Sequence, residues 1–237
     1  MKIPARLLGL ILVALVVGPA VASAQYFGQN KVQYRTFDFK VLKTEHFDIY
    51  YYPEEEEATR MVARMAERWY GRLSRLLAHE LRGRQPLILY ASGPHFRQTN
   101  TIQGAIGEGT GGVTEAFKRR IVLPLAGPLE LTDHVLGHEL VHAFQYDITG
   151  TNVNTNTAGA LALPLWFIEG MAEYLSIGPV DPHTAMWMRD AARRERLPTI
   201  DDLNNPRYFP YRYGHALWAF IAGKYGDNAI PALLRAG

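Results

Sequence analysis

The segment His138-Glu139-Leu140-Val141-His142 places two histidines four positions apart, with a glutamate directly after the first. In a helix, residues four apart lie one above the other, so His138 and His142 can share one metal ion with Glu139 beside it. A catalytic zinc takes three protein ligands and keeps its fourth position for water. The pattern therefore predicts a helix that carries two zinc ligands, and the third must come from elsewhere in the chain.

A second segment, from Trp166 to Tyr174, contains two glutamates at the same spacing. Glu169 and Glu173 stand among apolar residues, where burial of an unpaired charge is costly. An amphipathic helix explains the apolar residues of this run but not its two carboxylates. A metal and a histidine explain both, so Glu169 is the predicted third ligand and Glu173 is predicted to orient one zinc histidine through its second ring nitrogen. The alternative is a decayed or purely structural site.

His134 lies four residues before His138 but is not expected to bind the same ion. Each step of four residues climbs about 6 Å, which places His134 and His142 about 12 Å apart along a helix, too far for one ion. We expect His134 to interact with polar groups near the start of this helix.

These segments resemble motifs of the glutamate-zincin class of metallopeptidases, in which the third ligand is a glutamate on a second helix. Trp-Phe-Ile-Glu-Gly-Met-Ala at 166–172 resembles the Trp-Leu-Asn-Glu-Gly-Phe-Ala run of the aminopeptidase branch. Pro-Tyr-Arg-Tyr-Gly-His-Ala-Leu at 210–217 resembles its Pro-Tyr-x-x-Gly-x-Ala-Leu run. The resemblance implies that Glu169 is a zinc ligand and that Tyr211 is a catalytic residue that stabilises the transition state.

From residue 25 onward, most of the chain is similar to exported bacterial peptidase-MA-like domains, which often precede a β-propeller. This resemblance implies a zincin-like metallopeptidase fold, one zinc ion (Zn2+) per chain, a peptide or protein substrate, and a β-propeller as a further domain or partner. The gap between His142 and Glu169 is longer than in the aminopeptidases. Their Gly-x-Met-Glu-Asn motif, which binds the substrate amine, has only a faint echo in Gly112-Val113-Thr114-Glu115-Ala116. Endopeptidase and aminopeptidase action therefore both stay open.

The order of the predicted elements is strand, helix, strand, strand, helix, helix, which is typical of an α+β chain. Strands are predicted at 37–41, 47–51, 86–91 and 117–123, and C-terminal helices at 217–225 and 229–235. The resemblance to zincins implies that 117–123 is an exposed edge on which a peptide lies. The alternative is a strand covered on both sides that ends at Pro124. We predict a small mixed sheet with an edge strand over a metal helix and a helical C-terminal half.

Residues 1–24 are predicted to be a signal peptide and not part of this fold. Lys2 and Arg6 precede an apolar run from Leu7 to Val17, and Ala22-Ser23-Ala24 is typical of a cleavage site. We expect an exported protein, periplasmic or secreted, with no stable membrane insertion after cleavage. The alternative is an uncleaved membrane anchor, for which the apolar run is short.

Length and composition indicate one domain at 25–237, because 237 residues with 48% hydrophobic side chains can bury one proper core. The resemblance implies that this domain is a zincin-like metallopeptidase, as the front part of a longer architecture or by itself. The chain has no cysteine, which excludes a disulfide framework. Loss of Lys2 and Arg6 from the 25 basic residues leaves 23, which equals the number of acidic residues. A net charge of zero argues against a nucleic-acid or anionic-membrane partner.

The predicted function is zinc-dependent hydrolysis of peptide bonds. Zinc acidifies a water and polarises the carbonyl, and Glu139 is the predicted general base that takes the proton and passes it to the leaving nitrogen. Tyr211 is the predicted donor to the oxyanion. The alternative is an exported binding or assembly module that keeps the zinc fold without turnover. Glu139 favours the enzyme, because a structural zinc has no use for a general base.

Overall fold

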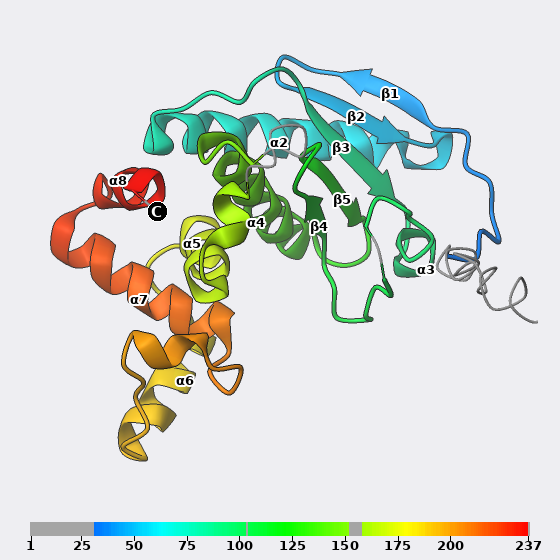
Figure 1. Ribbon diagram of the computed structural model, residues 1–237. Helices are drawn as coiled ribbons and strands as arrows, with labels where there is room; N and C mark the ends of the chain where they lie inside the picture. The colour runs from blue at the N-terminus through cyan, green and yellow to red at the C-terminus, as the bar shows by residue number, and fades with distance from the viewer. Residues whose placement is uncertain (1–30, 103, 152–157, 237) are drawn as a thin grey trace, which may run out of the picture.

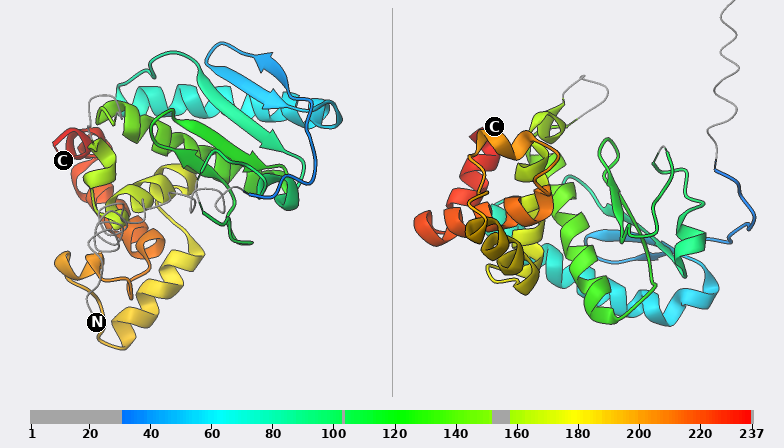
Figure 2. Two further views of the ribbon diagram at one scale, coloured as in Figure 1. Left: turned by 45° about the vertical axis from the view of Figure 1, so that its right-hand side comes forward. Right: turned by 90° about the horizontal axis from the view of Figure 1, so that it is seen from below.

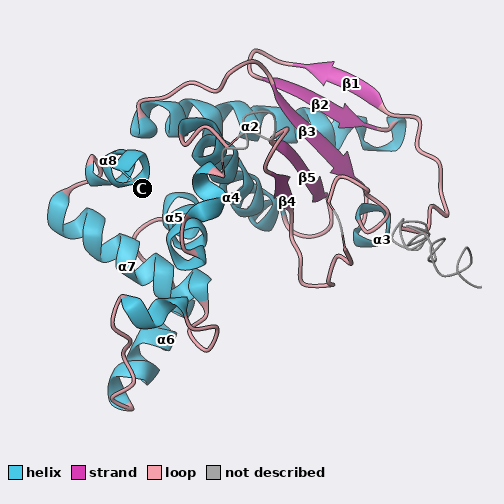
Figure 3. Ribbon diagram, viewed as in Figure 1, coloured by secondary structure: helices cyan, strands magenta, loops and turns pink. Residues whose placement is uncertain are grey.

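The computed structural model describes residues 31–102, 104–151 and 158–236, so the predicted signal peptide and its cleavage site lie outside the described residues. The strands are β1 (Lys40–Lys43), β2 (Phe47–Tyr51), β3 (Gln85–Tyr90), β4 (Val113–Glu115) and β5 (Arg120–Pro124). The helices are α2 (Glu56–Leu77), α3 (Gly93–Phe96), α4 (Leu129–Ile148), α5 (Leu165–Ile177), α6 (Pro182–Arg193), α7 (Pro210–Tyr225) and α8 (Ala229–Ala236). All described strands precede α4 and only helices follow it, and Figure 3 shows the strands together on one side of the molecule, which confirms the α+β prediction.

The five strands form one mixed sheet in the order β1-β2-β3-β5-β4. The two outer pairs, β1 with β2 and β4 with β5, are antiparallel, whereas β2, β3 and β5 run parallel. Alternate side chains of the central strands face opposite sides of the sheet. Ile49, Leu87 and Ile121 belong to the main core with α2 and α4, and Val122 belongs to a smaller aromatic cluster on the other face.

The prediction that the strand at 117–123 forms an exposed edge is wrong. The strand found there, β5, lies between β3 and β4, with Ile121 opposite Leu87 on one side and Thr114 on the other. This is the alternative of a strand covered on both sides, and the unbroken Ile-Val-Leu run is typical of a strand buried on both faces. The edge position belongs to β4, whose three residues are too few for an alternating pattern to indicate a strand.

The first predicted strand, at 37–41, also differs from the structure, in which the strand begins and ends later in the sequence. β1 begins only at Lys40, and it pairs antiparallel with β2. Phe37 and Phe39 precede it and pack against Tyr52 and Tyr90, with ring centroids 4.9–5.8 Å apart. Their alternation therefore reflects an aromatic cluster and not strand pairing.

Helix α4 runs through the centre of the molecule, between the sheet with α2 and the C-terminal helices (Figures 1 and 2). Every residue from Leu136 to Gln145 is buried, as expected for a helix covered on all sides. Gly137 makes room for α2, because a β-carbon there would lie 2.7 Å from the ring of Trp69. The Trp69 indole donates to Asp133 at 3.0 Å. These contacts fix the turn of α4 that carries His138.

The helices α5 and α7 pack against each other along most of their length, and α8 returns to the end of α2 (Figure 1). Arg235 of α8 donates to the carbonyl oxygen of Leu77 at 2.7 Å. None of the described helices combines the length and the apolar character that crossing a membrane requires.

Candidate metal centre

Three potential ligand atoms converge between α4 and α5. Nε2 of His138 lies 3.1 Å from Nε2 of His142 and 3.1 Å from Oε2 of Glu169. Nε2 of His142 lies 3.3 Å from the same carboxylate oxygen. Ligands at the usual zinc distances in a tetrahedron are separated by about 3.3 Å, so the spacing of these atoms suits one ion. The structure thus brings the three predicted ligands together, and their donor atoms form a group that could hold a metal.

The orientation of the His142 ring is fixed by Gln145. The amide nitrogen of Gln145 donates to the carbonyl oxygen of Ile168 at 3.0 Å, which leaves its amide oxygen to face Nδ1 of His142 at 2.8 Å. Since that oxygen can only accept, Nδ1 carries the proton and Nε2 of the neutral ring presents a lone pair. The lone pair is directed toward the atoms of His138 and Glu169.

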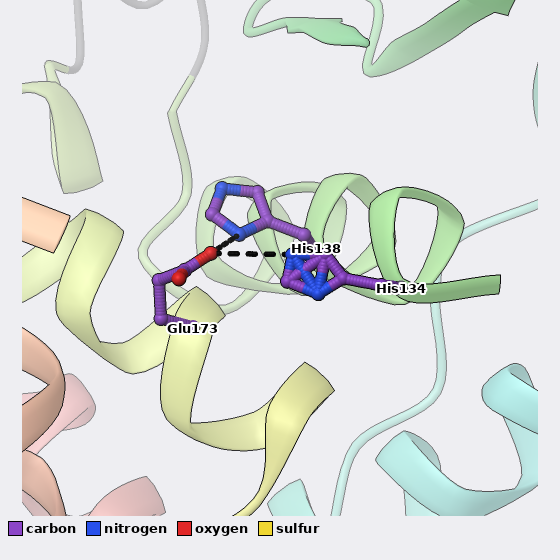
Figure 4. A group of neighbouring side chains, drawn as sticks. All are labelled: His134, His138 and Glu173. Carbon is purple, nitrogen blue, oxygen red and sulfur yellow. Dashed lines mark ion pairs between the residues drawn. The ribbon is translucent and has the colours of Figure 1, made fainter. Parts of the chain in front are cut away.

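The His138 ring has the Glu173 carboxylate beside it as an ion-pair contact. Its Nδ1 lies 3.0 Å from Oε1 of Glu173, and Nε2 of His134 lies 3.4 Å from the same oxygen. Figure 4 shows both rings on successive turns of α4 with the Glu173 carboxylate opposite them on α5. The other oxygen of Glu173 accepts from Arg212 at 3.1 Å. This position suits the predicted role of Glu173, and it makes His134 a neighbour of that carboxylate.

The electrostatics of this site favour a positive charge at its centre. Burial alone would lower the pKa of His138, but the carboxylates of Glu169 and Glu173 overcome this and raise it to about 10. Burial opposes ionisation of Glu169, yet hydrogen bonds to His138 and His142 hold the pKa of that carboxyl far below its usual range. Without a proton on His138, three acceptor atoms face one another. A metal ion at this point can replace that proton, so the residues fit a metal cofactor.

Glu139 points toward β4 and lies against Thr114. The Thr114 hydroxyl lies 2.7 Å from Oε2 of Glu139 and 2.9 Å from its backbone oxygen, so it can donate to either. Gly112 allows this approach, because a β-carbon there would lie 3.0 Å from Cγ of Glu139. The run at 112–116, which resembles the aminopeptidase motif only weakly, therefore holds the predicted base in place.

Two tyrosines flank the ligands. The ring of Tyr211 stacks on His138 with centroids 5.8 Å apart, and that of Tyr146 stacks on His142 at 6.3 Å. Burial and the nearby carboxylates, Glu169 foremost, raise the pKa of Tyr146 to about 12. The pKa of Tyr211 is raised by burial and by the charge and hydrogen bonding of Glu169. Both phenols are therefore protonated near neutral pH and can donate a hydrogen bond.

A cleft of about 690 Å³ leads to this site. Its walls are the glycine-rich loop at 107–112, the end of β5, and the first residues of α7. His138, Glu139 and Tyr211 line it, which places the predicted base and the predicted oxyanion donor on one accessible surface. This volume is in the range of small-molecule and substrate sites.

Four residues of the site have no counterpart among the sequence predictions: Thr114, Gln145, Tyr146 and Arg212. Gln145 and Tyr146 follow His142 by three and four positions, so the helical spacing that identifies the ligands could have indicated them as neighbours. Thr114 and Arg212 reach the site only through tertiary packing, and the sequence carries no local signal for either.

Comparison of the chain with protein-family models, with curated proteins and with solved structures found no match in any of the three.

Proposed function

We propose that this protein is a zinc-dependent peptidase with a zincin-like fold, exported from the cell that makes it. The observation that carries the proposal is the convergence of the Nε2 atoms of two imidazoles and one carboxylate oxygen within 3.1–3.3 Å of one another. Gln145 faces Nδ1 of His142 and Glu173 faces Nδ1 of His138, which leaves both Nε2 atoms directed toward the proposed metal. Residues placed only for packing would not need their Nε2 atoms to face each other.

The donor set supports zinc over other ions. Two imidazoles and one carboxylate are characteristic ligands of catalytic zinc, which keeps an open fourth position. Calcium and magnesium prefer six or more oxygen ligands, and soft metals prefer thiolates, of which this chain has none. His138, His142 and Glu169 would hold one ion per chain.

When bound, zinc lowers the pKa of a water molecule and polarises a peptide carbonyl. Glu139 accepts the proton of the attacking water and returns it to the leaving nitrogen, and Thr114 holds its carboxylate in position. Tyr211, whose ring stacks on His138, donates its hydroxyl to the oxygen that becomes negative in the transition state. Arg212 and Glu173 keep the His138 ring oriented throughout.

The proposed substrate is an extended peptide, bound along the free edge of β4. Among the described strands, β4 pairs with β5 alone, so its other edge can add a further strand through backbone hydrogen bonds. Thr114 of this strand contacts the proposed base directly, so a peptide added to this edge would lie beside Glu139. Such binding depends on hydrogen bonds to the peptide backbone more than on its side chains, as expected for a peptidase of broad specificity.

The proposal is tested by metal analysis of the purified mature protein and by hydrolysis of a labelled unfolded protein, with and without chelator. We expect about one zinc per chain and activity that disappears with chelator and returns with zinc. His142→Ala should lose both metal and activity, whereas His183→Ala, at an exposed position on α6, should keep both. Stoichiometric zinc without hydrolysis would favour the binding or assembly module, and absence of zinc would reject the metal site.

A further inference from the structure

A second cavity, of about 900 Å³, lies between α6 and the chain that leads into α7, and its lining residues differ from those of the cleft. Arg194, Arg196 and Arg207 line it together with one carboxylate, that of Asp190. Arg194 pairs with Asp190 at 2.8 Å. The Arg196 guanidinium makes no hydrogen bond or ion pair with any other described residue. The cavity therefore carries a local excess of positive charge in a chain whose acidic and basic residues nearly balance.

The remaining wall of the cavity is aromatic. The rings of Trp187 and Tyr213 meet edge to face with centroids 6.2 Å apart, and Tyr208 meets Tyr213 at 5.2 Å. The Arg207 guanidinium lies over the Tyr208 ring at 4.6 Å. Trp187 is 38% exposed although it belongs to this cluster, so a flat apolar surface remains open to a ligand.

The cavity adjoins the candidate metal centre through a single aromatic side chain. Phe209 contacts Trp187 at 5.7 Å on one side and Tyr211 at 5.1 Å on the other, and it also lines the cleft. The three arginines do not line the cleft. A ligand in this cavity would thus occupy a site of its own, next to the proposed catalytic tyrosine.

We infer that this cavity binds a ligand whose anionic group, carboxylate or phosphate, is joined to an aromatic body. Guanidinium groups recognise both anions through charge-assisted, often paired hydrogen bonds. Arg196 is the residue best placed to do so, because its guanidinium is not committed to another described group. The exposed face of Trp187 and the ring of Tyr213 provide stacking surfaces for the aromatic part. The volume is sufficient for a small molecule or for two to three side chains of a peptide.

The test is calorimetric titration of the zinc-loaded mature protein with phenylacetate, phenyl phosphate, phenylacetamide and inorganic phosphate. Both aromatic anions should bind about tenfold or more tightly than the neutral amide and than inorganic phosphate, and added salt should weaken them. A preference for phenyl phosphate identifies the anion as phosphate, and a preference for phenylacetate identifies it as carboxylate. Equal binding of charged and neutral aromatic compounds would overturn the inference.

Substitutions in the cavity test whether the aromatic anion binds there. Arg196→Gln and Trp187→Ala should each weaken the preferred aromatic anion about fivefold or more. The matched control is Arg189→Gln, an exposed arginine on α6 that does not line the cavity, and it should leave the affinity unchanged. An anion held at the metal centre would be insensitive to Arg196→Gln. Unchanged affinity in that variant, or an equal loss in the Arg189 control, would therefore reject this cavity as the site.

Discussion

Gly170 of α5 and Gly214 of α7 meet backbone to backbone. A β-carbon on Gly170 would collide with the backbone of Gly214, and one on Gly214 would collide with the carbonyl oxygen of Trp166 and lie 2.8 Å from Cα of Gly170. Gly170 directly follows the proposed ligand Glu169, and Gly214 follows Tyr211 by three positions. This close crossing is therefore what brings the first turn of α7 against the metal centre.

Gly214→Ala should separate the two helices. Because the added methyl group meets backbone and not a flexible side chain, we expect the free energy of unfolding to fall by about 2 kcal/mol or more, measured by urea denaturation. Gly223→Ala on the same helix is the matched control, since a β-carbon there meets nothing within 4 Å and alanine favours the helix. It should leave stability unchanged or raise it slightly. Equal stability of the two variants would contradict the close backbone contact between α5 and α7.

Replacement of Gln145 by leucine should weaken zinc binding. The change leaves the carbonyl of Ile168 and Nδ1 of His142 without their partner, so the His142 ring loses its fixed tautomer and orientation. Loss of such an orienting group lowers metal affinity by about 10–100-fold. Competition with a zinc-sensitive dye measures the affinity, and a thermal melt of each protein separates this effect from misfolding. An unchanged zinc affinity in a folded variant would remove Gln145 from the site.

The metal-free protein should lose stability as the pH rises above neutral. Carboxylate contacts raise the pKa of His138 from 6.5 to about 10, so the folded state holds a proton that the unfolded chain releases. This contribution is complete below about pH 6.5 and is lost as the pH approaches 10. Urea midpoints of chelator-treated protein at several pH values measure it. His138→Asn lacks the titrating group and should show a flatter profile; the same slope in both would contradict the assignment.

Tyr211→Phe should reduce kcat about a hundredfold while zinc content and KM change little, because the lost hydrogen bond is needed mainly in the transition state. Tyr213→Phe should be mild, since Tyr213 packs against Trp187 and Tyr208 and lines the other cavity. Tyr146→Phe is the informative comparison, because Tyr146 flanks His142 as Tyr211 flanks His138. A larger loss in Tyr146→Phe would transfer the oxyanion role to that residue.

The candidate metal ligands were predictable because their arrangement is local. Spacings of four residues within α4 and within α5 place His138 with His142 and Glu169 with Glu173, whatever the rest of the fold does. The pairing of the strands is not local. The apolar residues at the end of 117–123 indicate a buried strand but not its neighbours, so they could not reveal that β4 pairs with β5. Thr114 and Arg212 join the site through this same long-range packing.

The Gly170–Gly214 contact was only partly predictable: the sequence motifs contain both glycines, but their contact depends on tertiary packing. Both glycines belong to the runs that resemble zincin motifs, yet nothing in the sequence explains why glycine is needed at either position. Their function follows only from the distance between α5 and α7, because a side chain at either position would push Tyr211 away from Glu169. The motif resemblance thus includes two glycines whose role, the close contact of α5 with α7, is visible only in the folded structure.

The most direct test of the proposed mechanism is Glu139→Gln, with zinc content and peptide hydrolysis measured on the same sample. Glu139 contacts Thr114 and does not belong to the group of ligand atoms, so the amide should preserve the metal site while removing the base. We predict about one zinc per chain, as in the unmodified protein, and turnover reduced by about a hundredfold or more. Full zinc content together with turnover within about twofold of the unmodified protein would contradict the assignment of Glu139 and the proposed mechanism with it.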